Sequence, residues 1–194
     1  MRLKKLDTIG NIVFDYIISV VILNLSLLLI IPFIPLWVGY QKYVETDLHS
    51  RSLRSIFINI KENLRIVSQL TLFLLIIFGF AFINLLWLET EIAFLDIIIK
   101  IFSYIMLWIG LTVLIYSPTI ITNMNVKFKE LIYNSIMLIF GGIINYILSM
   151  SLLVVFMYLS IQYIFVLVFG IPLVIYMISR LSILNLNHIK EKMK

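Results

Sequence analysis

The chain contains no cysteine, only two histidines and few charged residues. Asp, Glu, Lys and Arg make up 13% of its 194 residues, about half the share that is usual in soluble domains. The absence of cysteine excludes disulfides, thiolate metal ligands and cysteine nucleophiles. Apolar residues make up 62% of the chain and its mean hydropathy is +1.11. This composition excludes a disordered chain, a collagen and an ordinary soluble enzyme.

Motifs that carry hydrolytic or nucleotide chemistry are also missing. No HExxH, GxSxG, GxxxxGKS or GxGxxG string occurs, and His49 and His188 are far apart in the sequence. We therefore expect no enzyme, no metal site and no cofactor. The net charge of +5 is explained by membrane topology and anionic lipid, so no nucleic-acid partner is expected.

Long stretches without formal charge predict membrane-spanning helices. The longest of them are 16–41, 66–88, 101–126 and 131–179. A span needs about 20 mostly apolar residues to cross about 30 Å of hydrocarbon. As a single helix, the stretch 131–179 would measure about 70 Å. It must therefore fold back, and the polar interruption from Tyr158 to Gln162 is the predicted turn.

Two interpretations of the first run stay open, because Pro32 and Pro35 interrupt it. Either Pro32 ends a single span, or the prolines mark a sharp break after which a short helix returns to the starting side. The returning helix places every Lys and Arg except Lys100 on one side. Because cations near span ends stay cytoplasmic, we prefer this interpretation and predict that both termini are cytoplasmic. The basic start of the chain lacks a small-residue cleavage site, so we predict that it is retained.

The predicted fold is an all-α, polytopic transmembrane helical bundle that forms one integral membrane domain over residues 1–194. It has five long helices, a short Pro-broken returning helix and a basic amphipathic interfacial elbow. The predicted helices are about 11–31, 36–48, 52–87 with the elbow at 52–65, 95–117, 129–156 and 161–186. Pro118 is expected to end the helix 95–117, because it lacks the next helical N–H.

The elbow shows helical periodicity with one apolar face. That face consists of Leu53, Ile56, Phe57, Ile60 and Leu64, and the other faces carry Arg51, Arg54, Asn59, Lys61, Glu62 and Arg65. Such a helix lies in the headgroup plane, where its cations meet anionic lipids on the cytoplasmic side. The alternative is a docking surface for a cytoplasmic partner. The residues predicted to contact lipid or a partner are Arg51, Arg54, Phe57, Lys61, Arg65 and, at the inner end of the last helix, Arg180.

Uncharged amides inside the spans are candidates for intramembrane polar contacts. They are Asn24, Gln69, Asn84, Asn134 and Asn145. An amide in hydrocarbon seeks a partner across a helix interface, and such a contact contributes about 0.6 kcal/mol on average. We interpret these amides as helix-packing contacts. A polar cavity that binds a neutral solute is the alternative.

Three stretches together resemble the YesL-like family of small bacterial integral membrane proteins of uncharacterised function. The first is Asn24 followed by LSLLLIIP, the second is SLRSIFINIKENLRI at 52–66, and the third is YSPTIITNMNVKFKELIYNSIML at 116–138. They match the family's first helix with its Asn and Pro, its basic elbow, and its Pro-terminated span followed by a polar loop with a Lys. The resemblance implies an all-helical bundle in a bacterial cytoplasmic membrane and an accessory role beside carbohydrate uptake. It supplies no catalytic residues.

The sequence thus favours a multi-pass membrane protein that acts by binding, as an accessory, assembly or regulatory component beside a membrane transport system. The expected partners are membrane lipids and either another membrane protein or further copies of this chain. Two alternatives stay open. One is a small transporter or channel for a neutral solute or lipid, and the other is a tolerance protein that intercepts a membrane-active peptide.

Overall fold

The structure, a computed structural model, describes residues 30–46, 53–88 and 93–192 together with positions 13, 16, 17, 20 and 21. These residues are all-helical, with seven helices and no strand. The helices are α2 (Ile30–Glu45), α3 (Leu53–Glu62), α4 (Leu64–Leu86), α5 (Ala93–Asn123), α6 (Phe128–Gly141), α7 (Ile143–Gln162) and α8 (Ile164–Lys192). The predicted all-α class is confirmed.

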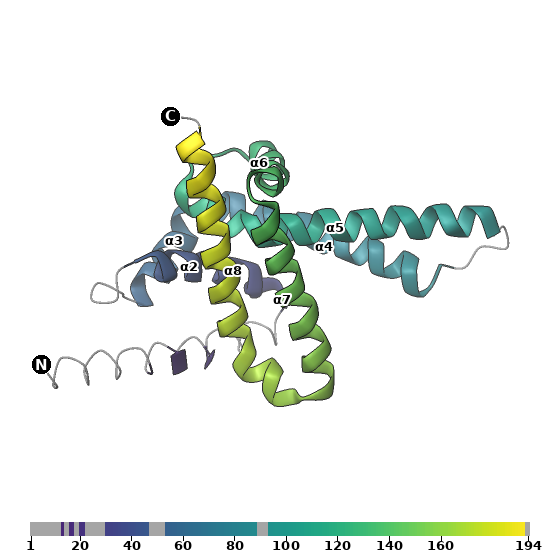
Figure 1. Cartoon of the computed structure of the whole chain (residues 1–194), viewed down its shortest axis with the longest axis horizontal. Coiled ribbons are helices and arrows are strands. Elements are labelled where there is room, and N and C mark those ends of the chain that lie inside the picture. Colours follow the sequence, from purple (N-terminus) through teal and green to yellow (C-terminus); the bar gives the residue numbers. More distant parts are fainter. Residues whose placement is uncertain are drawn as a thin grey trace, which may run out of the picture.

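Four of the helices are long and apolar enough to cross a membrane, namely α4, α5, α7 and α8. They form two helical hairpins, α4 with α5 and α7 with α8, which leave a common base in different directions (Figure 1). Large apolar side chains cover both hairpins on the outside, such as Phe94 at 71% exposure and Phe165 at 73%. Such surfaces are unfavourable in water and favourable in lipid. Four helices that are long and apolar enough to span a membrane suggest a membrane protein, as the sequence predicts.

The core lies where the hairpins meet. α5 has 31 residues and is about 46 Å long, so it extends well beyond one hydrocarbon thickness. Its outer part is largely exposed, whereas residues 115–121 are buried continuously. α2, α4 and α8 pack around this inner part, with Trp37 and Tyr116 among the largest fully buried side chains. α5 therefore belongs to a hairpin at one end and to the core at the other.

The predicted helix 129–156 is wrong, because the chain breaks at Gly142 into α6 and α7. A Cβ at Gly142 would lie 1.9 Å from the Asn185 side-chain oxygen, so α8 can approach this closely only because the residue is glycine. The predicted turn at Tyr158 to Gln162 also lies too early. α7 continues to Gln162, and Tyr163 alone separates it from α8.

The prolines end fewer helices than predicted. α5 continues through Pro118 to Asn123, and α2 is already helical at Ile30, so the predicted starting point at residue 36 is wrong as well. Neighbouring helices can satisfy the carbonyls that a proline leaves without a donor. The carbonyl that Pro118 leaves without its helical donor is that of Leu114, four residues earlier. The Ser182 hydroxyl on α8 donates to the neighbouring Ile115 carbonyl at 3.4 Å, so α8 contacts the turn before Pro118.

The elbow and the span that follows it are two helices rather than one continuous helix. α3 ends at Glu62, and Asn63 leaves the helical conformation with φ −106° and ψ 14° before α4 begins. The predicted helix 52–87 is therefore divided at Asn63. This division lets α3 pack against α2 while α4 runs out along the hairpin.

Candidate functional site

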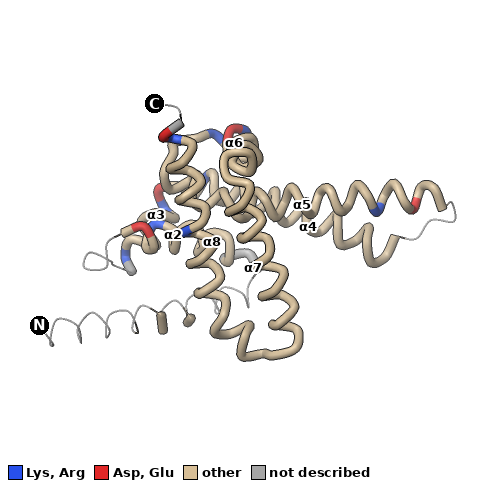
Figure 2. Tube along the Cα trace, in the orientation of Figure 1, with Lys and Arg blue, Asp and Glu red and all other residues tan. Residues whose placement is uncertain are grey.

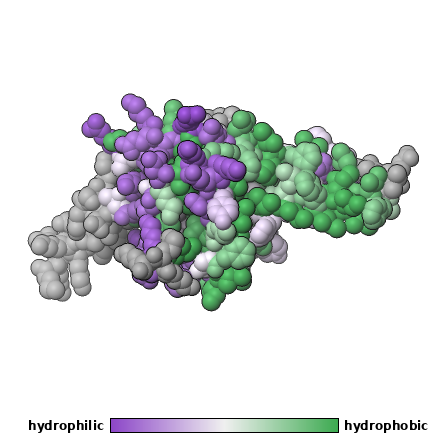
Figure 3. All heavy atoms as spheres, turned by 90° about the horizontal axis from the view of Figure 1, so that it is seen from above, coloured by the Kyte–Doolittle hydropathy of each residue, from purple (hydrophilic) through white to green (hydrophobic). Residues whose placement is uncertain are grey.

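Charged side chains gather on α2, α3, the start of α6 and the end of α8, and we call these parts of the molecule the charged end. Figure 2 shows Lys and Arg around α3, α6 and the last turns of α8. Lys100 lies far out on α5, and its Nζ atom is 2.7 Å from Asp96 Oδ2. In Figure 3 hydrophilic residues cover the charged end and hydrophobic residues cover the α4–α5 hairpin. Within the described residues, the Lys and Arg side chains are thus concentrated at the charged end, and Lys100 lies apart from them.

Asn59 fixes α3 to the rest of the charged end. Its Nδ2 atom donates to the Val38 carbonyl at 2.8 Å and to Thr122 Oγ1 at 3.4 Å, and its Oδ1 accepts from Asn63 Nδ2 at 3.0 Å. Only 5% of Asn59 is exposed, so its predicted place on the outer polar face is wrong. The hydrogen bonds compensate for burying the amide, and they join α3 to α2 and α5.

The close packing of α3 on α2 leaves the opposite face of α3 uncovered. Ile56 is buried and lies against Gly39, where an added Cβ would come within 2.6 Å of Ile56 Cγ2. Phe57 is 60% exposed and Ile58 44% exposed. Arg54 and Lys61 are exposed too, so we call Arg54, Phe57, Ile58 and Lys61 the α3 face. It combines an aromatic ring, an aliphatic side chain and two cations on a fixed helix.

A second polar contact joins α2 to the inner end of α5. Glu45 Oε1 accepts from Gln41 Nε2 and from Asn123 Nδ2, each at 2.8 Å. Asn123 Nδ2 also donates to the Thr119 carbonyl at 3.0 Å. Two amide donors on one carboxylate oxygen hold the end of α2 against α5, since hydrogen bonds to a charged group are stronger than neutral ones.

An asparagine network ties α8 to α5 and α7 near the break at Gly142. Asn185 Nδ2 donates to Tyr116 OH at 2.8 Å and to the Gly142 carbonyl at 3.1 Å, and Asn185 Oδ1 accepts from Asn145 Nδ2 at 2.6 Å. Both amide hydrogens of Asn185 are thereby used. We call these four residues the Asn185 network. It satisfies a buried amide and supports the carbonyl at the helix break.

A hydroxyl pair extends this polar region along α5. Thr112 Oγ1 donates to the Trp108 carbonyl at 2.8 Å and lies 2.9 Å from Tyr146 OH. Because a hydroxyl has one hydrogen, Tyr146 is the donor to Thr112. The Tyr146 ring stacks on Tyr116 with 6.1 Å between centroids. Tyr146 therefore joins α7 to α5 beside the Asn185 network.

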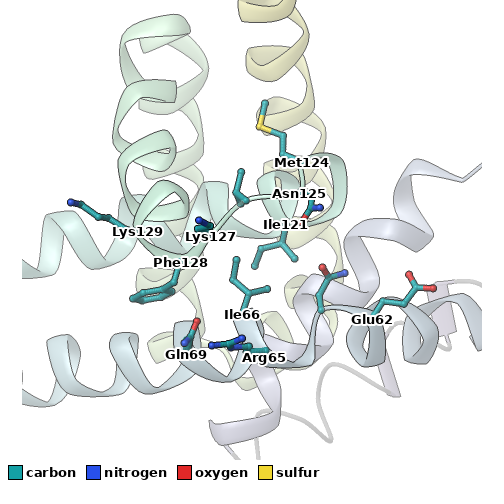
Figure 4. A pocket seen from close by; sticks show the side chains of 12 residues that line it. Glu62, Arg65, Ile66, Gln69, Ile121, Met124, Asn125, Lys127, Phe128 and Lys129 are labelled. Atoms are coloured by element: carbon teal, nitrogen blue, oxygen red, sulfur yellow. The ribbon is translucent and has the colours of Figure 1, made fainter.

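Two adjoining cavities open at the charged end. The larger, of about 660 Å³, lies between the start of α4, the end of α5 and the start of α6 (Figure 4). The smaller, of about 520 Å³, lies between α3, Lys42 of α2 and the end of α5. Glu62, Asn63, Ile121, Met124 and Asn125 line both of them. The cavities therefore form one concave surface that runs from α3 to α6.

The structure does not bring the predicted amides together. Asn24 lies outside the described residues. Asn145 is in the Asn185 network, Asn84 is buried on α4 and Asn134 is half-buried on α6. Gln69 is exposed and lines the larger cavity. The described amides therefore lie at separate places in the fold, and their predicted packing role stays a prediction.

The remaining predicted cations lie in different places. Arg51 is outside the described residues. Arg65 lines the larger cavity. Arg180 is exposed on α8, where its Nε donates to Tyr176 OH at 3.2 Å and its guanidinium lies 5.3 Å from the centre of the Tyr176 ring. Its predicted contact with lipid phosphates stays a prediction.

Sequence reasoning missed the most connected residues of these sites. Asn185 lies inside the predicted helix 161–186 but is not among the predicted contacts, because its partners are 40 to 69 residues away in the sequence. Lys127 and Lys129 attract notice in the sequence only as loop cations, and nothing there shows that they share a cavity with Arg65. The burial of Asn59 was predictable from the sequence, because Asn59 lies one helical turn after Ile56 and so shares its buried face.

The described residues of the charged end offer groups that can bind ligands. In the part of the chain that the structure describes, no group of three or more His, Cys, Asp and Glu residues could hold a metal ion. The charged end offers cations, amides and concave apolar walls. Such groups recognise anions and protein surfaces.

Comparison with protein-family models, curated proteins and solved structures finds no match to this chain. The resemblance to YesL-like proteins therefore stays a prediction, and the functional argument depends on the residues themselves.

Proposed function

We propose that this chain is an integral membrane protein that acts by binding, as an accessory, assembly or regulatory component beside a membrane transport system. Its partner contacts the α3 face. The main observation behind this proposal is that Asn59 and Ile56 fix α3 in place. The residues of the α3 face nevertheless stay exposed. The resemblance to YesL-like proteins suggests carbohydrate uptake as the process served.

The composition of the α3 face supports a protein partner. Aromatic and arginine side chains are enriched at protein interfaces, where they supply much of the binding energy. Asn59 holds α3 in place before binding, which lowers the entropy cost of association. The smaller cavity begins beside Ile58, so a partner that covers Phe57 can also insert a side chain there. If α3 contacted only lipid headgroups, the cations and Phe57 would take part in that contact, but the smaller cavity would stay empty.

The charge distribution supports an orientation for this surface. Cations stay on the cytoplasmic side of the inner membrane of bacteria, and the charged end holds Arg54, Lys61 and Lys127. We therefore propose that the charged end is cytoplasmic. A partner would reach α3 from that side, at the level of the lipid headgroups.

Site-specific photo-crosslinking in living cells tests the proposal. A photo-reactive residue at Ile58 is expected to give one discrete protein adduct, because Ile58 borders the smaller cavity and the α3 face. The matched control is Ile161, which is 86% exposed at the far turn between α7 and α8 and should give no such adduct. A reciprocal crosslink from the identified partner back to Ile58 completes the support. Lipid adducts alone at Ile58, or the same protein adduct from both positions, would overturn it.

A further inference from the structure

We propose that the larger cavity binds an anionic phospholipid, with the phosphate between Arg65 and Lys127 and an acyl chain along α4. This ligand site adjoins the partner surface through the smaller cavity but is not the α3 face itself, because Arg54, Phe57 and Lys61 do not line the larger cavity. The proposal therefore goes beyond the proposed function and does not depend on it.

The first observation is unbalanced positive charge around the cavity. Arg65, Lys127 and Lys129 line it, and Glu62 is the one carboxylate among its described lining residues. Figure 4 shows Arg65 and Lys127 on facing walls, with Lys129 at the rim. Glu130 does not line the cavity but is close by, with its Oε2 accepting from the Lys127 backbone N–H at 2.9 Å, and the three cations still outnumber these two carboxylates. An anion between Arg65 and Lys127 would neutralise the excess charge.

The second observation is a set of polar groups suited to phosphate and glycerol oxygens. Arg65 offers a planar guanidinium that binds two phosphate oxygens at once. Gln69 lies one turn further along α4 and lines the same cavity, as does Asn125 on the opposite side. Their amide groups can donate to ester or hydroxyl oxygens next to the phosphate.

The third observation is an apolar stripe that continues from these polar groups. Arg65, Gln69, Leu72 and Ile76 share one face of α4, because they are spaced by four, three and four residues. Leu72 is 61% exposed and Ile76 is 60% exposed. Phe128 packs edge-on against Phe73 at 5.6 Å and closes the wall beside the stripe. The face thus changes from cationic to amide to aliphatic within three turns.

The change from cationic to aliphatic side chains along α4 fits an amphiphile better than a free anion. α4 is a candidate membrane span that begins at Leu64, so Arg65 lies where headgroup phosphates are found and Ile76 lies where acyl chains are found. A free phosphate would use the cations and leave the aliphatic stripe without a role. A neutral or zwitterionic lipid would use the stripe and leave the excess positive charge unbalanced.

Native mass spectrometry of the purified full-length protein in a neutral detergent tests this inference. The protein is titrated with phosphatidylglycerol, phosphatidylcholine or inorganic phosphate. Phosphatidylglycerol is expected to bind at one site with at least tenfold preference over phosphatidylcholine, and inorganic phosphate is not expected to stay bound. Equal binding of the two lipids, or retention of inorganic phosphate at the same site, would overturn the inference.

A matched pair of variants locates the site. In R65Q/K127Q the binding constant for phosphatidylglycerol is expected to fall about 30-fold, because each cation contributes about 1 kcal/mol and 1.4 kcal/mol is a factor of ten. The control K190Q removes one charge from an exposed position on α8 outside the cavity and should bind like the parent. Unchanged binding in R65Q/K127Q, or an equal loss in the control, would contradict the proposed site.

The single variant K127Q keeps the test available if R65Q/K127Q does not fold. Lys127 precedes α6, and the Glu130 carboxylate accepts from its backbone N–H, which the substitution retains. A fall of about fivefold is expected from one cation. Folding is checked by helical circular dichroism and gel filtration. A folded K127Q that binds phosphatidylglycerol like the parent would overturn the inference.

Discussion

The Asn185 network and the larger cavity are both polar, but they differ in what their polar side chains contact. In the network, Asn185 uses both amide hydrogens and its oxygen on Tyr116, Gly142 and Asn145. In the cavity, Arg65 and Lys127 lie on different walls, and Glu62 is the one carboxylate among the described lining residues. The difference indicates that polar groups within the spans stabilise the fold, whereas those at the charged end are available for ligands.

The largest expected effect is that of G142A on stability. Its Cβ would lie 1.9 Å from Asn185 Oδ1, so Asn185 must move and lose its hydrogen bonds. The free energy of unfolding is expected to fall by about 3 kcal/mol, from overpacking and the lost contacts together. Unfolding in mixed micelles measures it. The matched control is G79A, because a Cβ at Gly79 meets nothing within 4 Å. G79A should be neutral or slightly stabilising.

The double variant G142A/N185A sharpens this comparison. Once Asn185 is shortened, the added methyl group no longer clashes with its amide. The combined loss should therefore be smaller than the sum of the two single losses. Additive losses would show that Gly142 and Asn185 act independently, and would contradict the explanation of the helix break.

N59A is expected to have the next largest effect. It removes the bonds to Val38, Thr122 and Asn63, so unfolding free energy should fall by about 2 kcal/mol. Because Asn59 fixes α3, crosslinking from Ile58 should decrease as well. N187A is the control, since Asn187 is exposed on α8. A fully stable N59A would mean that packing of Ile56 alone holds α3 in place.

Y146F should have a smaller effect, because it removes the hydroxyl that contacts Thr112 and keeps the ring. We expect a loss of about 0.6 kcal/mol, the average for such bonds between membrane helices. Tyr158 on α7 is 61% exposed, so Y158F is a suitable control that should not change stability. Unfolding titrations of the two variants side by side give the difference. Equal stabilities of Y146F and Y158F would show that the Tyr146 hydroxyl does not stabilise the fold.

R65Q/K127Q should change stability least, by about 0.5 kcal/mol or less, because neither cation compensates a buried charge. The same unfolding titration, in detergent without added lipid, measures this. A large loss of stability would show that the cavity is a structural feature like the Asn185 network. The contrast between the two polar regions would then be wrong.

Features set by local composition were predictable from the sequence, and features set by distant contacts were not. The span 66–88 is closely matched by α4 at Leu64–Leu86, because charges bound the apolar run on both sides. The break at Gly142 depends on Asn185, which is 43 residues away. Similarly, Pro118 predicts a helix end locally, but packing against α8 lets α5 continue. The candidate cavity was unpredictable, since Arg65 and Lys127 meet only through the fold.

Cysteine labelling tests most directly the claim that both hairpins cross the membrane from a cytoplasmic charged end. The chain has no cysteine, so single cysteines can replace Leu88 near the end of α4, Ile161 near the end of α7 and Asn125 between the cavities. An impermeant maleimide should label positions 88 and 161 in intact cells, and position 125 only after the cells are opened. Labelling of position 125 in intact cells, or of only one of the two hairpin ends, would contradict the account.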